Sequence, residues 1–198
     1  LDAEPMKSNI GIAHTRWATH GVPSEKNAHP HISHDGLAIV HNGIIENHEQ
    51  LRDELKSLGY VFTSDTDTEV IAHRIHFHLK KTPKLFEAVQ ATVHELEGAY
   101  ALVVMSEANP GQLILARCGC PVVVGLGDNE NFVASDVSAL LPVTRRFIFL
   151  EEGDVAEIHR SHVRVLDKDG KVTHRPVKES ELSADAAEKG PDPHYMLT

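Results

Sequence analysis

The chain has 198 residues and a formal net charge of -10, with 41% hydrophobic and 24% charged residues. This composition excludes a mostly disordered chain, and the acidic balance argues against a nucleic-acid partner, because phosphate binding needs a basic surface. No apolar run approaches the roughly 18 residues of a membrane span, so the sequence predicts no membrane partner. A chain of this length forms one domain or at most two, without metal or disulfide staples.

The first part of the chain is rich in residues that form loops. The sequence predicts a short strand over residues 10–13 and then a long loop over residues 15–34, where Gly, Pro, His, Asn and Ser accumulate. An apolar run over residues 37–40 predicts a buried strand, and the His-Asn-Gly of residues 41–43 is typical of a turn. A loop of this length is usually functional, so its polar residues are candidates for a site.

Three helices are expected next. Leucines at helical spacing predict a helix over residues 46–58, which Gly59 ends. Capping residues at 66–69 predict the start of a second helix that runs to Leu79. Proline at the first turn opens a third helix, over residues 83–98.

The second half of the chain has the patterning of strands. Helices between an early strand and a strand-rich second half predict an α+β fold with antiparallel sheets. The expected strands cover residues 100–105, 113–116, 122–126, 132–134, 147–150, 155–158 and 163–166.

Two groups of potential ligands are interpreted as structural. Cys118 and Cys120 are too few for a disulfide framework or a zinc site, and we interpret them as small buried residues beside a strand turn. Free thiols fit a reducing, cytoplasmic environment. His73, His76 and His78 lie in the second helix without an HExxH pattern, so we interpret them as polar residues of the helix surface. No metal site is predicted.

The loop after residue 13 carries the first candidate site residues. Arg16 can bind a carboxylate through two parallel hydrogen bonds, and Thr19 and His20 can add further ones. The alternative is a surface arginine beside an anchoring tryptophan, Trp17.

Two further segments supply complementary groups. The Asn42 amide and the Gly43 N–H form a pair of donors of the kind that stabilises a tetrahedral oxyanion, although the same dipeptide also forms ordinary turns. Asp67 can hold an ammonium group, and the alternative is that it only caps a helix. Together with Arg16, these groups would recognise an amino acid and favour acyl transfer.

Several long motifs agree in order and spacing with a known family. The chain resembles the glutamine-hydrolysing domain of the glutamine:fructose-6-phosphate aminotransferases, or glucosamine-6-phosphate synthases, which are class II glutamine amidotransferases. This resemblance runs from Gly11 onward and implies a four-layer α/β/β/α sandwich with antiparallel sheets, of the N-terminal-nucleophile hydrolase type, without metal or organic cofactor. The segments that carry it are residues 15–21, 27–31, 41–47, 64–69, 140–146 and 149–154.

The resemblance also implies roles for individual residues. It places Arg16, Thr19 and His20 at the substrate α-carboxylate and Asp67 at the α-ammonium. It implies an oxyanion hole formed by Asn42 and Gly43. It places Trp17 in a mobile loop near the pocket and makes His29 a candidate for ordering that loop.

The reaction implied by the resemblance needs a group that this sequence lacks. Family members attack the amide carbon of glutamine with the thiol of an N-terminal cysteine, release glutamate, and pass ammonia to sugar-isomerase domains that convert fructose 6-phosphate to glucosamine 6-phosphate. This chain has no cysteine before Cys118. We therefore expect a truncated type 2 amidotransferase domain over residues 1–177 that lacks its first strands and hydrolyses no glutamine, and a linker toward the isomerase domains over residues 178–198.

Two other functions stay open. The same scaffold suits a non-catalytic module that binds an amino acid or a partner, and other class II amidotransferases share the Asn-Gly pair. Glutamine or glutamate and the sugar-isomerase domains of the parent chain are the expected partners. A homodimer is a further expectation, because a sheet that lacks a strand exposes an edge.

Overall fold

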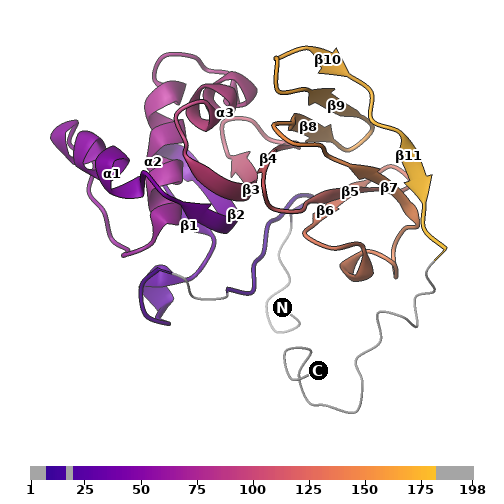
Figure 1. The fold of residues 1–198 in the computed structure, drawn as a ribbon, viewed down its shortest axis with the longest axis horizontal. Coiled ribbons are helices and arrows are strands. Elements are labelled where there is room, and N and C mark those ends of the chain that lie inside the picture. The colour runs from indigo at the N-terminus through magenta and orange to yellow at the C-terminus, as the bar shows by residue number, and fades with distance from the viewer. Residues whose placement is uncertain (1–7, 17–19, 182–198) are drawn as a thin grey trace.

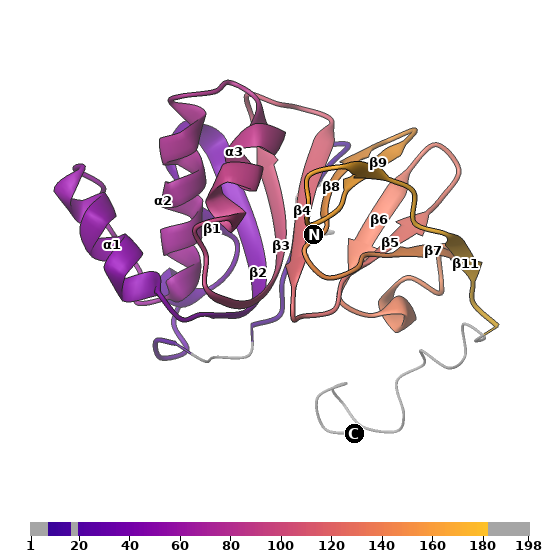
Figure 2. The ribbon, with the colours of Figure 1, turned by 45° about the horizontal axis from the view of Figure 1, so that its top comes forward.

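The computed structural model of the chain describes residues 8–16 and 20–181. Within these ranges the fold has a layer of three α-helices, a seven-stranded sheet and a four-stranded sheet (Figure 1). Figure 2 shows the helices on one side of strands β1–β4 and the smaller sheet on the other. The strand pairs in both sheets are antiparallel, which confirms the expected α+β class.

The elements follow the predicted order closely. The α-helices are α1 (His48–Ser57), α2 (Asp67–Leu79) and α3 (Leu85–Val93). The larger sheet has the order β1 (His31–Ile32), β2 (Leu37–Ile45), β3 (Gly98–Ser106), β4 (Gln112–Cys118), β8 (Val155–His159), β9 (Val163–Leu166) and β10 (Val172–Thr173). The smaller sheet has the order β11 (Val177–Glu179), β7 (Arg146–Phe149), β5 (Val123–Leu126) and β6 (Asn131–Ala134). Three short 3-10 helices are η1 (Glu25–Asn27), η2 (His34–Gly36) and η3 (Val137–Ala139).

Alternation along β4 shows how the layers pack. Ile114 faces the helices with Ile71 and Ile75 of α2, whereas its neighbour Leu115 faces the smaller sheet with Val124. Successive side chains of a strand point to opposite faces, so one strand supports two cores. The larger sheet is therefore buried on both faces, between the helices and the second sheet.

The outer face of the smaller sheet is covered differently. Phe147 of β7 and Val123 of β5 pack there against Leu140 and Leu141, which follow η3. Among the described residues, this face carries a 3-10 helix where the four-layer expectation places a second layer of α-helices.

The predicted turn at residues 41–43 is wrong, because β2 continues through it. β2 pairs with β3 from Leu37 opposite Ser106 to Ile45 opposite Gly98. Long-range pairing along a whole strand therefore overrides the local turn preference of Asn-Gly. The strand expected over residues 10–13 is also wrong, since these residues have no regular structure.

The interpretation of the α2 histidines as surface residues is wrong as well. His73, His76 and His78 are buried, with at most 9% of each residue exposed. His73 Nδ1 lies 2.8 Å from the Ser33 hydroxyl, and His76 Nδ1 lies 2.7 Å from the Tyr60 hydroxyl. Because α1, the sheet and the η2 segment enclose α2, its polar residues find partners inside the protein.

The C-terminal part of the chain adds two short strands that the sequence did not predict. β11 spans the expected domain boundary between residues 177 and 178 and pairs with β7. Residues 182–198 lie outside the described residues, so the linker stays a prediction. Within the described ranges, none of the helices combines the length and apolar character that crossing a bilayer requires.

Candidate active site

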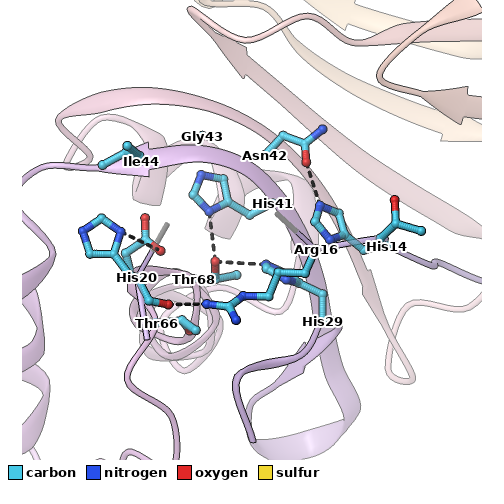
Figure 3. Close-up of a pocket in the computed structure, with 12 residues that line it drawn as sticks. His14, Arg16, His20, His29, His41, Asn42, Gly43, Ile44, Thr66 and Thr68 are labelled. Carbon is cyan, nitrogen blue, oxygen red and sulfur yellow. Dashed lines mark hydrogen bonds and ion pairs between the residues drawn. The ribbon is translucent and has the colours of Figure 1, made fainter. Parts of the chain in front are cut away.

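A cavity of about 330 Å³ lies where the N-terminal segment, β2 and the start of α2 meet. Figure 3 shows Arg16, His20, Gly43 and Thr66 around this space. The full lining is His14, Thr15, Arg16, His20, His29, His41, Asn42, Gly43, Ile44, Thr66, Asp67 and Thr68.

The structure brings together six of the eight residues to which the resemblance gives a role, His29 among them. Arg16, His20, Asn42, Gly43 and Asp67 all line the cavity, although they come from three separate segments. The other two, Trp17 and Thr19, lie outside the described residues.

The Arg16 side chain is held by backbone carbonyl groups of the loop that follows it. Its Nη2 donates to the carbonyls of His20 and of Gly21, the latter at 3.0 Å, and Nη1 lies 3.5 Å from the Val22 carbonyl. A guanidinium has five N–H donors, so these three bonds orient it and leave others for a carboxylate.

Asp67 supplies the opposite charge. It is the first residue of α2, where the helix dipole favours a carboxylate, and only 3% of it is exposed. Its Oδ2 accepts a hydrogen bond from the Ile45 N–H at 2.9 Å, which fixes the side chain to β2. Its Oδ1 lies 4.0 Å from His20 Nδ1 and remains available to a cation in the cavity.

Asn42 and Gly43 form adjacent parts of the cavity wall. The Asn42 Oδ1 lies 2.6 Å from His14 Nε2, so this histidine nitrogen donates and the Asn42 amide N–H groups stay free to donate elsewhere. Gly43 has a φ of 127° and lies against the backbone of Ala99. The backbone of Ala99 fills the space that a Cβ would take, so glycine is what allows β2 and β3 to lie this close at the cavity wall.

Two histidines of the cavity wall, the buried His41 and the partly buried His29, share one hydroxyl group. Thr68 Oγ1 lies 3.0 Å from His41 Nδ1 and 3.1 Å from His29 Nε2. Burial lowers the pKa of His41 to about 4. Burial, reinforced by the neighbouring His14, lowers the pKa of His29 to about 3. Both imidazoles are neutral at pH 7, which leaves Arg16 as the permanent cation of the cavity.

The cysteines do not contribute to this cavity. Cys118 and Cys120 are half-buried free thiols, and neither lines it. Burial raises the pKa of both thiols, which makes them weak nucleophiles. Among residues 8–16 and 20–181, no group of three His, Cys, Asp or Glu side chains is arranged to hold a metal ion.

A second cavity of about 310 Å³ adjoins the first and extends between the two sheets. The two cavities share the wall formed by His14, Thr15, His41 and Asn42, and the second reaches Val133 of β6, the edge strand of the smaller sheet. This cavity could not be predicted from the sequence, because the residues that line it come from distant segments.

Sequence reasoning also missed several residues that organise the site. His14 contacts Asn42, Thr68 joins two histidines, and Asn27 binds two loops beside the cavity. Asn27 lies in a motif that carries the family resemblance, but nothing local distinguishes it from an ordinary loop residue.

Comparison with known proteins identifies the family. The family model described as a glutamine amidotransferase domain matches residues 14–142. The chain belongs to this family. The resemblance drawn from the sequence motifs is thereby confirmed, and the match contains all the proposed site residues.

Relatives of this amidotransferase domain are considerably longer. The chain is 58% identical over 197 residues to the glutamine–fructose-6-phosphate aminotransferase (isomerizing) of Shewanella oneidensis, and 57% identical over 195 residues to that of Escherichia coli K12. These alignments cover 100% and 98% of the chain and 32% of each relative. The chain therefore spans about a third of the length of the curated relatives it matches.

Solved structures confirm the fold. The glutamine phosphoribosylpyrophosphate amidotransferase of B. subtilis superimposes with a TM-score of 0.65 and 27% identity, over 80% of this chain and 35% of that one. A glutamine aminotransferase class-II domain protein from Silicibacter pomeroyi, at 16% identity and a TM-score of 0.52 over 73% of this chain and 72% of that one, shares the fold alone. The amidotransferase domain thus has the N-terminal-nucleophile type of α+β sandwich.

Proposed function

We propose that this domain binds glutamine and is the glutaminase part of a glutamine–fructose-6-phosphate aminotransferase. The complete enzyme hydrolyses glutamine to glutamate and uses the ammonia to convert fructose 6-phosphate to glucosamine 6-phosphate. The observation that carries this proposal is the convergence of Arg16, Asp67 and the Asn42-Gly43 pair on one cavity. The 57–58% identity to enzymes of that name favours it over other class II amidotransferases.

The charges of the cavity match the two ends of an amino acid. The Arg16 guanidinium pairs with the α-carboxylate, assisted by Thr19 and His20, and the free Asp67 Oδ1 accepts from the α-ammonium.

The substrate side chain then reaches Asn42 and Gly43. Their N–H groups stabilise the oxyanion that forms when the amide carbon is attacked. Removing one such donor typically lowers kcat by about 10²–10³.

The nucleophile is the missing component. Thioester formation needs an activated thiol, and the described lining contains no cysteine. We assign this thiol to an N-terminal cysteine of the complete enzyme, outside the given sequence. The cavity between the sheets reaches from Asn42 to β6, the edge strand of the smaller sheet, and the strand that carries the thiol pairs with this edge. A cytoplasmic location, association with sugar-isomerase domains and a homodimer are parts of the same proposal.

Calorimetric titration of the purified chain with L-glutamine or L-glutamate tests the binding site. We expect measurable binding that the Arg16→Ala variant weakens about 10–100-fold, because a charge-assisted hydrogen bond is lost. Arg146→Ala, which removes an exposed arginine from β7, is the matched control and should bind as the unchanged chain does. Equal binding by the Arg16→Ala variant would refute the carboxylate assignment.

A second assay tests the origin of the nucleophile. The chain as given should release no glutamate from glutamine. Release at an ordinary enzymatic rate would contradict the assignment of the thiol to a segment outside it.

The absence of a cysteine from the described lining also suits a non-catalytic amino-acid-binding module. The residue at the nucleophile position of the complete protein distinguishes the two functions. A Met-Cys-Gly start supports the enzyme, and another residue at that position supports the binding module.

A further inference from the structure

Asn27 connects two segments that lie on different sides of the cavity. Asn27 is 0% exposed, and both the nitrogen and the oxygen of its side-chain amide form hydrogen bonds. Nδ2 donates to the Val22 carbonyl at 3.0 Å, and Oδ1 accepts from the Asp65 N–H at 2.9 Å. Nδ2 also lies 3.4 Å from Asp65 Oδ2. One buried side chain therefore satisfies backbone groups of residues that are more than 40 positions apart in sequence.

These two segments carry the two charges of the cavity. Residues 20–22 provide the carbonyl groups that hold the Arg16 guanidinium, and Val22 is the same residue that Asn27 contacts. On the other side, Asp65 is two residues before Asp67 in the turn that opens α2. A continuous series of hydrogen bonds thus runs from the guanidinium through Asn27 to the start of the helix that bears the carboxylate.

Gly21 shows how closely the two segments approach. Its φ is +77°, a conformation that glycine adopts readily. A Cβ at this position would lie 2.6 Å from Asn27 Nδ2 and 3.1 Å from Asp65 Cβ. The loop around Arg16 therefore lies directly on Asn27 and Asp65, with no room for an intervening side chain.

We infer that Asn27 is a positioning residue that sets the separation between the Arg16 guanidinium and the Asp67 carboxylate. The inference rests on the proposed function, because that separation matters only for a ligand that carries both an α-carboxylate and an α-ammonium. The exposed ion pair between Lys26 and Asp65, at 2.8 Å, joins the same two segments but contributes little, since both side chains are more than half exposed.

A pair of ligands separates this role from a general effect on stability. L-glutamine engages both charges, whereas glutaramate, which is glutamine without its α-amino group, engages the guanidinium alone. If Asn27 sets the separation, its loss impairs the ligand with two charged ends and largely spares the ligand with one. A merely structural role would weaken both ligands by the same factor and leave their ratio unchanged.

The experiment is an NMR titration of both ligands into the chain and its Asn27→Ala, Asn27→Asp and Lys26→Ala variants. Asn27→Asp retains the size of the side chain and the acceptor for the Asp65 N–H, but it replaces the donor to Val22 with an oxygen that the Val22 carbonyl and Asp65 Oδ2 repel. It is the second variant if Asn27→Ala does not fold. We expect each Asn27 variant that folds to bind glutamine about ten-fold or more weakly, as for a lost buried hydrogen bond, and glutaramate within about two-fold. Lys26→Ala should change neither affinity by more than about two-fold.

Several results would overturn the inference. Equal losses for both ligands in an Asn27 variant would make Asn27 a structural residue only, and unchanged glutamine binding would remove it from the site altogether. The Arg16→Ala variant keeps the two proposals distinguishable. If Arg16→Ala abolishes glutamine binding while the Asn27 variants keep the wild-type ligand ratio, the inference fails and the proposed function stands. If the unchanged chain binds no glutamine, both fail.

Discussion

At the scale of single residues, Gly43 lines the proposed site, and the packing of β2 against β3 requires glycine there. A Cβ there would collide with the carbonyl oxygen of Ala99, and the φ of +127° disfavours any side chain. We predict that Gly43→Ala lowers the free energy of unfolding by roughly 3–5 kcal/mol, because β2 must shift relative to β3. Urea unfolding followed by circular dichroism measures this loss.

Gly59 provides the control for this substitution. It also has a positive φ, +89°, but nothing lies within 4 Å of the position that a Cβ would take. Gly59→Ala should therefore cost only the backbone strain, about 1 kcal/mol. If the two variants lose similar stability, the close approach of Gly43 to Ala99 is not what requires glycine.

The same scale shows what the sequence reveals of the site. Arg16 and Asp67 were predictable because a cation and an anion for a small zwitterion stand out chemically, and the structure brings them to one cavity. Their proposed roles stay predictions. Asn27 and Thr68 were not predictable, because their importance comes from partners 38 and 27–39 residues away in the chain.

At the scale of secondary-structure elements, short sequence motifs predicted the structure correctly where contacts between neighbouring residues determine it. Thr66 caps α2 through the hydrogen bond that its side chain accepts from the Glu69 N–H, as the sequence predicted. Such motifs failed where pairing with a distant strand determines the structure. Pairing with β3 keeps the Asn-Gly pair of β2 extended, and the short strands β10 and β11 are defined by their pairing with β9 and β7. Burial of His73 likewise depends on elements that pack around α2.

The connection from β10 to β11 passes from one sheet to the other and is held by an ion pair between a partly exposed arginine and a buried carboxylate. Arg175 lies in this connection, and its Nε and Nη2 donate to the Asp154 carboxylate at 2.9 and 2.7 Å. Asp154 is 0% exposed and directly precedes β8. We predict that Arg175→Ala lowers the free energy of unfolding by about 3–5 kcal/mol, because it leaves a buried carboxylate without its cation. Thermal and urea unfolding measure the effect.

An exposed ion pair of the same protein is the comparison. The Lys84 Nζ lies 2.7 Å from the Glu87 Oε1, and most of the lysine side chain is exposed. Lys84 directly precedes α3, and Glu87 lies in its first turn. Lys84→Ala should cost less than about 1 kcal/mol. A loss no larger for Arg175→Ala would show that the connection between the sheets is held by its backbone pairing alone.

At the scale of the whole molecule, buried histidines couple folding to pH. The chain has 15 histidines. Burial lowers the pKa of His29 to about 3, that of His41 to about 4, and that of His31 to below its usual value. In the unfolded chain these groups return to a pKa of about 6.5. The unfolded chain therefore binds more protons below pH 6.5, and the stability that neutral burial provides is complete above that pH and is lost as the pH falls.

We predict that the free energy of unfolding decreases between pH 6.5 and 5, with each such histidine contributing a slope of up to about 1.4 kcal/mol per pH unit. This window lies above the titration of ordinary carboxylates, so the histidines dominate it. Urea unfolding at several pH values gives the slope, and His41→Gln should reduce it by about one proton. His162→Gln, which replaces an exposed histidine, is the control and should leave the slope unchanged. Stability that is constant or increases toward pH 5 would show that these imidazoles are protonated in the folded protein, with Thr68 acting only as an acceptor between His29 and His41.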